Sequence, residues 1–246
     1  MTIPMYEIGG VDPGPSGNLY QGYEAWKGWD KPFMYTVEDA AYFAGETGGA
    51  KIAGGDVLEI GFGSGSFLAW ARERGARVAG TEINPVLLAA ARDFGLDLLP
   101  ADFETVADTH ASRFDTIVAF DVFEHFALDV IMTHLRAAET MLKSSGQMFL
   151  RFPNAQSPFG LAPQNGDPTH KAALSRSVFE QLIQGTSFAV VRYAPSYRIG
   201  GGGLAKRLVR RLRYTARNLI AGLLNAIYAQ DIPWDPVVVL VLRKNP

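Results

Sequence analysis

The chain has 246 residues, of which 48% are hydrophobic, and its formal net charge is −2. This length and apolar content allow one large folded domain and exclude an intrinsically disordered chain. Because the sequence contains no cysteine, a disulfide framework and a cysteine nucleophile are excluded. The near-neutral charge gives no reason to expect nucleic-acid binding.

The first ten residues contain neither a basic segment nor an apolar stretch, so no signal peptide is predicted. No apolar run reaches the ~18 residues that a membrane-spanning helix needs. We therefore expect a cytoplasmic protein, and contact with the inner face of the membrane stays open because of a basic segment near the C-terminus.

The N-terminal segment, residues 1–35, is rich in glycine, proline and aromatic side chains, and few regular elements are predicted there. Two interpretations stay open: an arm whose aromatic residues are buried for stability, or a lid over a ligand. Tyr23, Trp26 and Trp29 in this segment would also suit stacking on a sugar. A short helix is then expected from the N-cap residue Thr36 to Gly45.

Strands and helices alternate from residue 56 onwards. This alternation predicts an α/β fold with a doubly wound parallel sheet and ligands at the carboxyl ends of its strands. After Pro153 the expected order is a polar loop to residue 173, a helix at 175–184 and two strands that flank a long insertion. The expected strands are 56–60, 77–82, 96–99, 114–120, 147–152, 188–193 and 237–242, and the earlier helices are 66–74, 85–94 and 128–143.

A glycine-rich stretch joins the first strand to its helix. Gly61, Gly63 and Gly65 let the backbone approach a ligand closely, and the helix start adds free N–H groups. These features predict a nucleotide-like ligand at this strand end. The G-x-G-x-G spacing, with Glu59 two residues before it, differs from the G-x-G-x-x-G of dinucleotide-binding proteins and argues against a nicotinamide oxidoreductase.

Acidic residues follow the next strands as well. Glu82 ends the second strand, where a carboxylate can accept both hydroxyls of a ribose. The alternative for Glu82 is a favourable charge at the start of the next helix. Asp102 follows the third strand and Asp121 the fourth. Four such sequence features, in this order between residues 56 and 125, are not expected to occur together by chance.

These features resemble the motifs of class I S-adenosylmethionine (SAM) methyltransferases, over residues 56–152. The resemblance implies a Rossmann-like, seven-stranded, mostly parallel sheet with an antiparallel last strand, and SAM as the cofactor. It implies that the glycine loop passes under the methionine part, that Asp102 accepts from the adenine amino group and that its neighbour packs on the ring. The implied cofactor contacts are Glu59, Gly61, Phe62, Gly63, Gly65, Glu82, Ile83, Asp102, Phe103, Asp121 and Val122.

Methyl transfer needs an aligned nucleophile and, for a hydroxyl acceptor, a group that takes a proton. The candidate catalytic residues are His125, beside the methionine site, and His170, in the loop after the fifth strand. Asp167 would orient His170, or else it would merely form a turn. The other two histidines, His110 and His134, are expected to be incidental. The acidic and histidine residues show no metal-ligand spacing, so no metal site is predicted, but a Mg²⁺-dependent variant stays open.

The segment 203–230 contains six basic residues and no acidic one. The remaining 17 basic residues face 25 acidic ones, a net charge of −8. At about 100° per residue, an amphipathic helix over 204–228 is predicted, with an apolar half and a basic half. Peripheral contact with anionic lipid is favoured over the alternative, in which the apolar face packs on the sheet.

We expect a single methyltransferase domain over 1–246: an arm or lid at 1–50, a SAM-binding core at 51–195 and 236–246, and the basic insertion at 200–232. The loop after Phe152 resembles bacterial enzymes of polysaccharide and O-antigen synthesis, which implies O-methylation of a glycan or lipid-linked saccharide. The alternatives are a small hydrophobic acceptor such as a quinone precursor, since ubiquinone-pathway O-methyltransferases carry a similar insertion, and a non-catalytic SAM-binding protein. The oligomeric state is not predicted.

Overall fold

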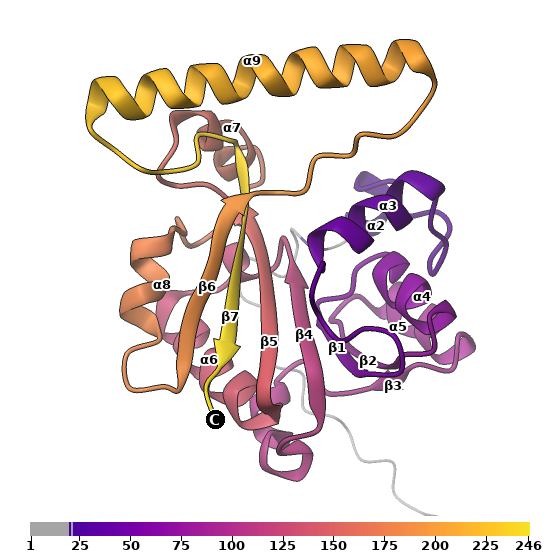
Figure 1. Cartoon of the computed structure of the whole chain (residues 1–246). Helices are drawn as coiled ribbons and strands as arrows, with labels where there is room; N and C mark the ends of the chain where they lie inside the picture. The colour runs from indigo at the N-terminus through magenta and orange to yellow at the C-terminus, as the bar shows by residue number, and fades with distance from the viewer. Residues whose placement is uncertain (1–19, 21) are drawn as a thin grey trace, which may run out of the picture.

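The computed structural model describes residue 20 and residues 22–246, so the first 19 residues of the expected arm, and residue 21, lie outside it. A seven-stranded sheet with the order β3-β2-β1-β4-β5-β7-β6 forms its centre (Figure 1). The β5–β7 and β6–β7 pairs are antiparallel, and the other neighbouring pairs are parallel. The predicted Rossmann-like α/β fold is confirmed.

The strands and helices follow the chain in the predicted alternation. The strands are β1 Asp56–Ile60, β2 Arg77–Thr81, β3 Asp97–Leu98, β4 Phe114–Phe120, β5 Leu142–Pro153, β6 Phe188–Pro195 and β7 Val237–Lys244. The helices are α2 Tyr23–Trp26, α3 Val37–Glu46, α4 Ser66–Glu73, α5 Pro85–Asp93, α6 Leu128–Met141, α7 Leu161–Asn165, α8 Arg176–Leu182 and α9 Leu204–Tyr228.

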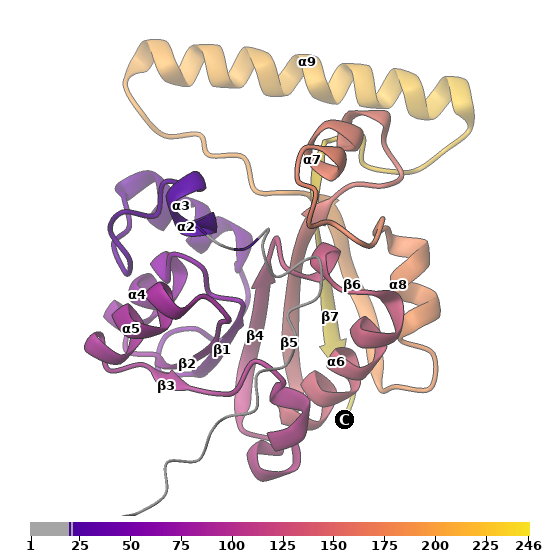
Figure 2. The ribbon, with the colours of Figure 1, turned by 180° about the vertical axis from the view of Figure 1, so that it is seen from behind.

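The core consists of two apolar layers, one on each face of the sheet. Successive strand residues point to opposite faces, so Val57 packs in one layer and Leu58 in the other. Helices α3, α4 and α5 cover the first face, and α6 and α8 cover the second (Figure 2). Because both faces are covered, the central strands are apolar throughout, and their carboxyl ends are left to hold polar groups.

Local signals explain several helix starts. Thr36 caps α3 in a reciprocal pair with Asp39, and Ser175 accepts from the backbone N–H of Val178 at the start of α8, as predicted. The structure differs around residue 142, where β5 begins five residues before the expected strand. The register shift between Phe114 and Thr116 accommodates this early start, and such a bulge leaves no strong signal in the sequence.

The predicted amphipathic helix is present as α9, which lies across the sheet end, apart from the strands (Figures 1 and 2). Part of its polar side faces the body of the protein: Arg210 pairs with Glu38 at 3.0 Å, and Arg217 pairs with Asp235. Its large apolar side chains are instead exposed, by 51% to 85%, so its apolar face does not pack on the sheet. They are Leu204, Leu208, Val209, Leu212, Leu219, Ile220, Leu223 and Ile227.

Within the described part of the chain, no helix has both the length and the apolar character required to cross a membrane.

Candidate functional site

A cavity of about 590 Å³ lies at the carboxyl ends of β1, β2 and β4, and this volume is in the range of small-ligand sites. It lies where the strand order reverses beside β1, the usual ligand position in doubly wound sheets. The structure therefore brings most of the predicted cofactor contacts together in one wall. These are Glu59, Gly61, Phe62, Gly63, Glu82, Ile83, Asp102, Asp121 and Val122.

The glycine loop has a backbone that side chains would obstruct. Gly61 and Gly63 have φ angles of 63° and 51°, in the left-handed region. A Cβ atom would lie 2.8 Å from Val122 at the first position and 2.8 Å from the Trp29 ring at the second. Gly65, with φ of 70°, lies under Phe33 and starts α4 without lining the cavity.

Glu59 is buried at the end of β1, and its Oε2 atom has no hydrogen-bond partner among the described residues. Burial raises the pKa of its carboxyl well above the ordinary value, and the nearby Arg151 cation opposes that shift. A buried polar atom without a partner calls for an explanation, and a ligand donor in the cavity supplies one.

Arg151 is a residue of this cavity wall that the sequence did not single out. It holds Asp121, whose φ is 57°, through a 2.9 Å bond from Nε to Oδ1 and a second bond from Nη2. It also donates to the Tyr42 hydroxyl at 2.8 Å. Burial disfavours the cation, but Asp121 and Tyr42 keep the pKa of Arg151 above its ordinary value. The signal that could have identified Arg151 is its charge, because the rest of the segment Met148–Phe152 in β5 is apolar.

The predicted ribose ligand Glu82 is engaged by the backbone. Its carboxylate accepts from the N–H groups of Gly63 at 2.9 Å, Ile83 at 2.7 Å and Asn84 at 3.0 Å. Glu82 thus fixes the glycine loop against the end of β2, and the side chain of Asn84, not that of Glu82, caps α5.

The third strand end places its two predicted residues differently. Asp102 is exposed at the cavity, whereas Phe103 is fully buried in the core. The Phe103 ring packs on His134 with centroids 4.7 Å apart and does not line the cavity. The apolar side chain that is exposed near this place is Ile83, at 59%.

The described part of the arm forms another wall. Tyr20, Tyr23 and Trp29 line the cavity, whereas Trp26 is exposed outside it. Phe33, by contrast, is buried and stacks on Phe94 with centroids 4.2 Å apart. The arm therefore contains both core-packing and cavity-lining aromatic residues.

Two polar contacts attach α2 to different sides of the site. Asn84 Nδ2 donates to Glu24 at 2.6 Å, beside the cofactor wall. Tyr23 Oη donates to Asp167 at 2.8 Å, in the loop that follows β5. The short helix is therefore bound to both sides of the cavity mouth.

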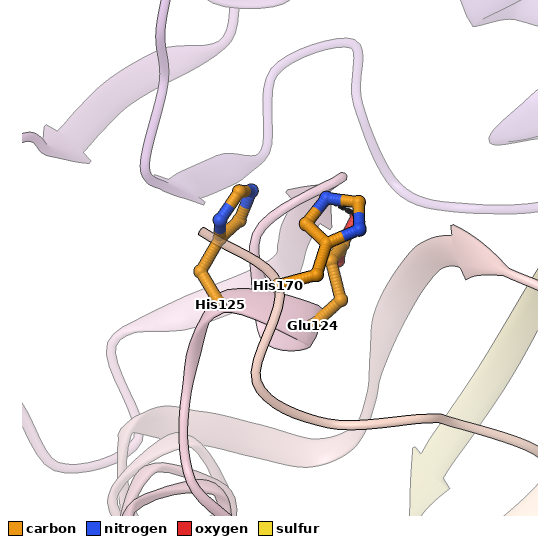
Figure 3. Close-up of side chains that lie close together, drawn as sticks. All are labelled: Glu124, His125 and His170. Carbon is orange, nitrogen blue, oxygen red and sulfur yellow. Dashed lines mark ion pairs between the residues drawn. The ribbon is translucent and has the colours of Figure 1, made fainter. Parts of the chain in front are cut away.

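The two candidate catalytic histidines lie together with Glu124 (Figure 3). The ring centroids of His125 and His170 are 4.7 Å apart, and His125 lines the cavity. Burial lowers the pKa of His125 to about 4, so its imidazole is neutral at pH 7. A neutral imidazole can take a proton or bind a cation.

The expected Asp167 and His170 side chains lie together but make no hydrogen bond, since the Asp167 Oδ2 to His170 Nε2 distance is 4.0 Å. Asp167 instead accepts from the Thr169 hydroxyl, and Thr169 Oγ1 lies 2.8 Å from His125 Nδ1. His170 is oriented by the Gln164 carbonyl, 2.9 Å from its Nδ1. The loop therefore supports His125 through Thr169, which no local pattern in the sequence indicated.

A family model described as a methyltransferase domain matches residues 38–193. The chain belongs to this methyltransferase-domain family. The match includes the glycine loop, the three acidic strand ends and the histidine cluster, so the cavity lies within the matched region.

Curated relatives of this methyltransferase domain include the ubiquinone biosynthesis O-methyltransferase of Pseudomonas aeruginosa, 30% identical over 107 residues. A protein of the same description from Pseudomonas paraeruginosa is 29% identical over 107 residues. Each match covers 41% of this chain and 45% of the relative, so the chain spans less than half the length of these relatives.

Solved structures share the fold of this methyltransferase domain. A SAM-dependent methyltransferase from Archaeoglobus fulgidus has a TM-score of 0.55 and 18% identity, covering 85% of this chain and 93% of that one. A putative methyltransferase from Haloferax volcanii, in complex with its Trm112 activator, has a TM-score of 0.60 and 14% identity, covering 93% and 96%.

A third structure contains ligands. It is the 1,6-didemethyltoxoflavin-N1-methyltransferase of Burkholderia thailandensis with bound 1,6-didemethyltoxoflavin and S-adenosylhomocysteine. Its TM-score is 0.55 and its identity 16%, covering 100% of this chain and 94% of that one. At these identities the structural matches establish the fold alone.

One further pair in the methyltransferase domain was not anticipated. His134, expected to be incidental, is buried in α6 and lies in the cavity wall, with its Nε2 3.3 Å from Glu104. Burial lowers the pKa of His134, and Glu104 opposes that shift. No local sequence pattern indicates this contact, because the two residues come from different elements, 30 positions apart.

Proposed function

We propose that the chain binds SAM in this cavity and transfers its methyl group to a hydroxyl oxygen of an acceptor. The observation that carries the proposal is a single cavity that combines the glycine loop with acidic side chains at successive strand ends. Bound SAM supplies a methyl group that is already activated by the sulfonium charge.

The described residues fit this cofactor. Glu59, with its unpartnered Oε2, accepts from the ligand's ammonium group. Glu82 keeps lone pairs for the ribose hydroxyls beside its backbone contacts, and Asp102 is free at the rim for the adenine amino group. Gly61 and Gly63 allow close backbone approach, and the exposed Ile83 takes the ring contact that was expected of Phe103.

The chain's own groups hold and activate the acceptor. The aromatic rings of Tyr20, Tyr23 and Trp29 line the cavity and give the acceptor a surface to pack on. His125 is neutral and lies on the cavity wall, so we place the acceptor hydroxyl beside it, where the hydroxyl loses its proton. The His170 ring packs against His125, with centroids 4.7 Å apart. These two histidines are the catalytic candidates at this end of the cavity.

The acceptor that we propose is lipid-linked. Helix α9 exposes a continuous apolar stripe, and exposed basic residues flank it, an arrangement typical of helices that lie in an anionic membrane interface. Part of the polar side of α9 is already occupied by the body of the protein. The stripe is therefore free to enter a lipid surface while the cavity stays beside it.

Two acceptors of this class are supported by different observations. The partial match to ubiquinone biosynthesis O-methyltransferases favours a hydroxylated quinone precursor with a lipid tail. The aromatic cavity wall of Tyr23 and Trp29 favours a saccharide on a lipid carrier, since rings stack on sugars. Both are hydroxyl acceptors held at a membrane.

Calorimetry with SAM and with NADH tests the cofactor assignment. We expect SAM to bind, NADH not to bind, and Glu59→Gln to weaken SAM at least 10-fold, because an amide nitrogen replaces one of the two carboxylate oxygens that can accept from the ammonium group. Glu73→Gln, an exposed carboxylate on α4, is the matched control. Absence of SAM binding would refute the proposal.

Labelled SAM with bacterial membrane extracts then identifies the acceptor fraction. Label in the organic phase after mild acid release of sugars favours the quinone precursor, and label in the released saccharide favours the glycan. SAM binding with no transfer to any extract would leave a SAM-binding protein without catalysis.

A further inference from the structure

Glu124, His125 and His170 form a cluster that the sequence did not predict (Figure 3). Glu124 and His125 belong to the turn Phe123–His125 that follows β4, and His170 belongs to the loop before α8. One carboxylate oxygen and one ring nitrogen from each histidine lie within 4.8 Å of one another. Side chains from two separate segments thus meet at the cavity wall, where His125 is exposed to the cavity.

The carboxylate of Glu124 is the least satisfied group of the cluster. The residue is 1% exposed, and neither of its oxygens has a hydrogen-bond partner among the described residues. The Nε2 atom of His170 lies 3.9 Å from Oε1, too far for a hydrogen bond. A buried carboxylate left this way is destabilising unless a cation or a proton occupies the space beside it.

The hydrogen bonds of the two histidines fix where their ring protons lie. The Gln164 carbonyl can only accept, so His170 carries its proton on Nδ1 and keeps a lone pair on Nε2, the atom nearest Glu124. The Thr169 hydroxyl donates its proton to Asp167, so its oxygen, 2.8 Å away, accepts from Nδ1 of His125, and the Tyr20 hydroxyl, at 3.4 Å, is the longer contact of the same nitrogen. Nε2 of His125 then also has a lone pair.

This pattern is the one that metal-binding histidines use. A carbonyl, or a hydroxyl backed by a carboxylate, holds one ring nitrogen and leaves the other as a ligand. Both imidazoles here have such support, and the lone pair of His170 faces an unpartnered carboxylate. Lone pairs that face one another across a buried space repel unless a cation or a proton lies between them.

We propose that Glu124, His125 and His170 bind a divalent transition-metal ion, and that an acceptor oxygen completes its coordination. Two imidazole nitrogens with one carboxylate suit Zn²⁺, Mn²⁺ or Fe²⁺, whereas Mg²⁺ prefers oxygen ligands. Ligand atoms around an ion at about 2.1 Å lie roughly 3–4 Å apart, so the widest separation in the cluster, at most 4.8 Å, shortens by roughly 1–2 Å on binding.

The charges around the cluster are mixed. Asp121 and Asp167 add negative charge near Glu124 and His125, and Lys27, 3.6 Å from Asp167, and Arg151 oppose it. The Lys27 ammonium is already held by Asp167 and the rings of Tyr23 and Trp26. The cluster is therefore a site for one added cation.

The role of the ion rests on the proposed function. An ion that touches His125 lies at the cavity, where it lowers the pKa of a bound hydroxyl. The O–H bond breaks, the proton leaves to water and the electron pair stays on the oxygen that accepts the methyl group. In this arrangement His125 acts as a ligand and does not itself take the proton.

Metal titration of the full chain after EDTA dialysis tests the site without any need for turnover. We expect one Mn²⁺ per chain by electron paramagnetic resonance and one Zn²⁺ per chain by calorimetry. Glu124→Gln and His170→Asn should each weaken both at least 10-fold, because each removes one ligand. Circular dichroism and thermal unfolding verify that these variants fold.

The His134–Glu104 pair supplies a matched control, because it is another histidine–carboxylate contact at the same cavity. Glu104→Gln should leave the affinity for Mn²⁺ unchanged. Absence of stoichiometric binding of either ion, or equal affinity in the Glu124 variant, would overturn the proposal.

Failure of the metal site and failure of the proposed function are distinguishable. SAM affinity is measured on the metal-free chain, where the carboxylates and glycine loop should still bind it. Methyl transfer at full rate in EDTA would remove the ion from the reaction and leave the methyltransferase intact. Metal binding without SAM binding would support the metal site and refute the proposed methyltransferase function.

Discussion

The hydroxyl of Tyr23 donates a 2.8 Å hydrogen bond to Oδ2 of Asp167, which joins the N-terminal arm to the loop that follows β5. The other oxygen of Asp167 accepts from Thr169, and Thr169 in turn contacts His125. Through these contacts the position of the arm is linked to the orientation of a candidate catalytic ring.

Tyr23→Phe tests this link. The change removes the hydroxyl but keeps the ring, so a buried carboxylate loses one donor, which is worth about 1–3 kcal/mol. We expect methyl transfer to fall roughly 10-fold or more, with a small change in thermal stability, as measured by initial rates and a melting curve. Tyr35→Phe is the control, because the Tyr35 hydroxyl donates to Glu73 at the surface. An equal loss of methyl transfer in both variants would show that activity does not depend on the Tyr23–Asp167 contact.

Gly63→Ala tests the glycine loop. The residue has a φ of 51°, and a Cβ would lie 2.8 Å from Trp29, so both backbone strain and a clash are expected. The strain alone is worth about 1–2 kcal/mol of stability. We expect SAM affinity to fall at least 10-fold in calorimetry, because the loop and the arm cannot both keep their positions.

Gly95→Ala is the matched control for strain. Its φ is 69°, but nothing lies within 4 Å of its Cβ position. It should lose comparable stability while SAM affinity stays at the wild-type value. If Gly95→Ala weakened SAM as strongly as Gly63→Ala, general destabilisation would explain both results.

The pH dependence of stability should report an ion-pair cluster at the amino ends of β1 and β4. Arg77 and Lys143, at 2.6 Å and 2.7 Å, hold the pKa of Asp56 at about 2. Burial opposes a similar lowering at Asp115, but its hydrogen bonds from the Asp56 N–H, Lys143 and Lys51 prevail. Because the folded pKa values lie below the unfolded ones, this stability is present above about pH 4 and is lost as the pH falls towards 2.

Asp56→Asn should therefore lower the free energy of unfolding by about 1 kcal/mol at pH 7, after allowance for solvent screening. In urea titrations the gap from wild type should narrow below pH 4. Asp93→Asn, at an exposed position ending α5, should show no such gap. A gap for Asp56→Asn that stays constant from pH 7 to pH 3 would contradict the assignment.

Membrane contact through α9 predicts a difference between neighbouring arginines. Arg207, Arg211 and Arg213 are exposed, whereas Arg210 is held by Glu38. Changing the three exposed residues to alanine should weaken binding to anionic vesicles roughly 100-fold, at about 1 kcal/mol per charge. Arg210→Ala, a single change on the body side, should have a small effect.

Co-sedimentation with phosphatidylglycerol vesicles measures this difference, and neutral phosphatidylcholine vesicles give the baseline. Added salt should weaken the binding, because exposed charges are screened. If the wild-type chain failed to bind anionic vesicles at low salt, the lipid interface would be excluded.

The sequence predicted the parts of this molecule that depend on neighbouring residues. The glycine loop and the acidic residues Glu59 and Glu82 lie at strand ends, and parallel strands bring their carboxyl ends together automatically. One wall of the cavity could therefore be deduced without a structure. Helix α9 was equally clear, because its apolar spacing and its charge both follow the helical period.

The remaining parts of the site depend on contacts between distant segments. Arg151 reaches Asp121 only because β5 lies next to β4, and a single arginine in an apolar strand is weak evidence by itself. Phe103 was expected at the cofactor ring, but core packing against α6 turns it away. Glu124 was not predicted as a site residue, and its burial beside His170 depends on the path of a loop 46 residues later.

The short helix α2 holds Asn84 on one side of the cavity mouth through Glu24 and Asp167 on the other through Tyr23. The segment that covers the cavity thus also lies across its mouth, so the cofactor, the acceptor and the products must pass it. We expect turnover to be paced by the breaking of these two contacts, so that steady-state rates follow solvent viscosity while a first turnover is fast. The rate of the catalytic cycle would then be set by the movement of the arm, although the arm takes no part in the bond changes.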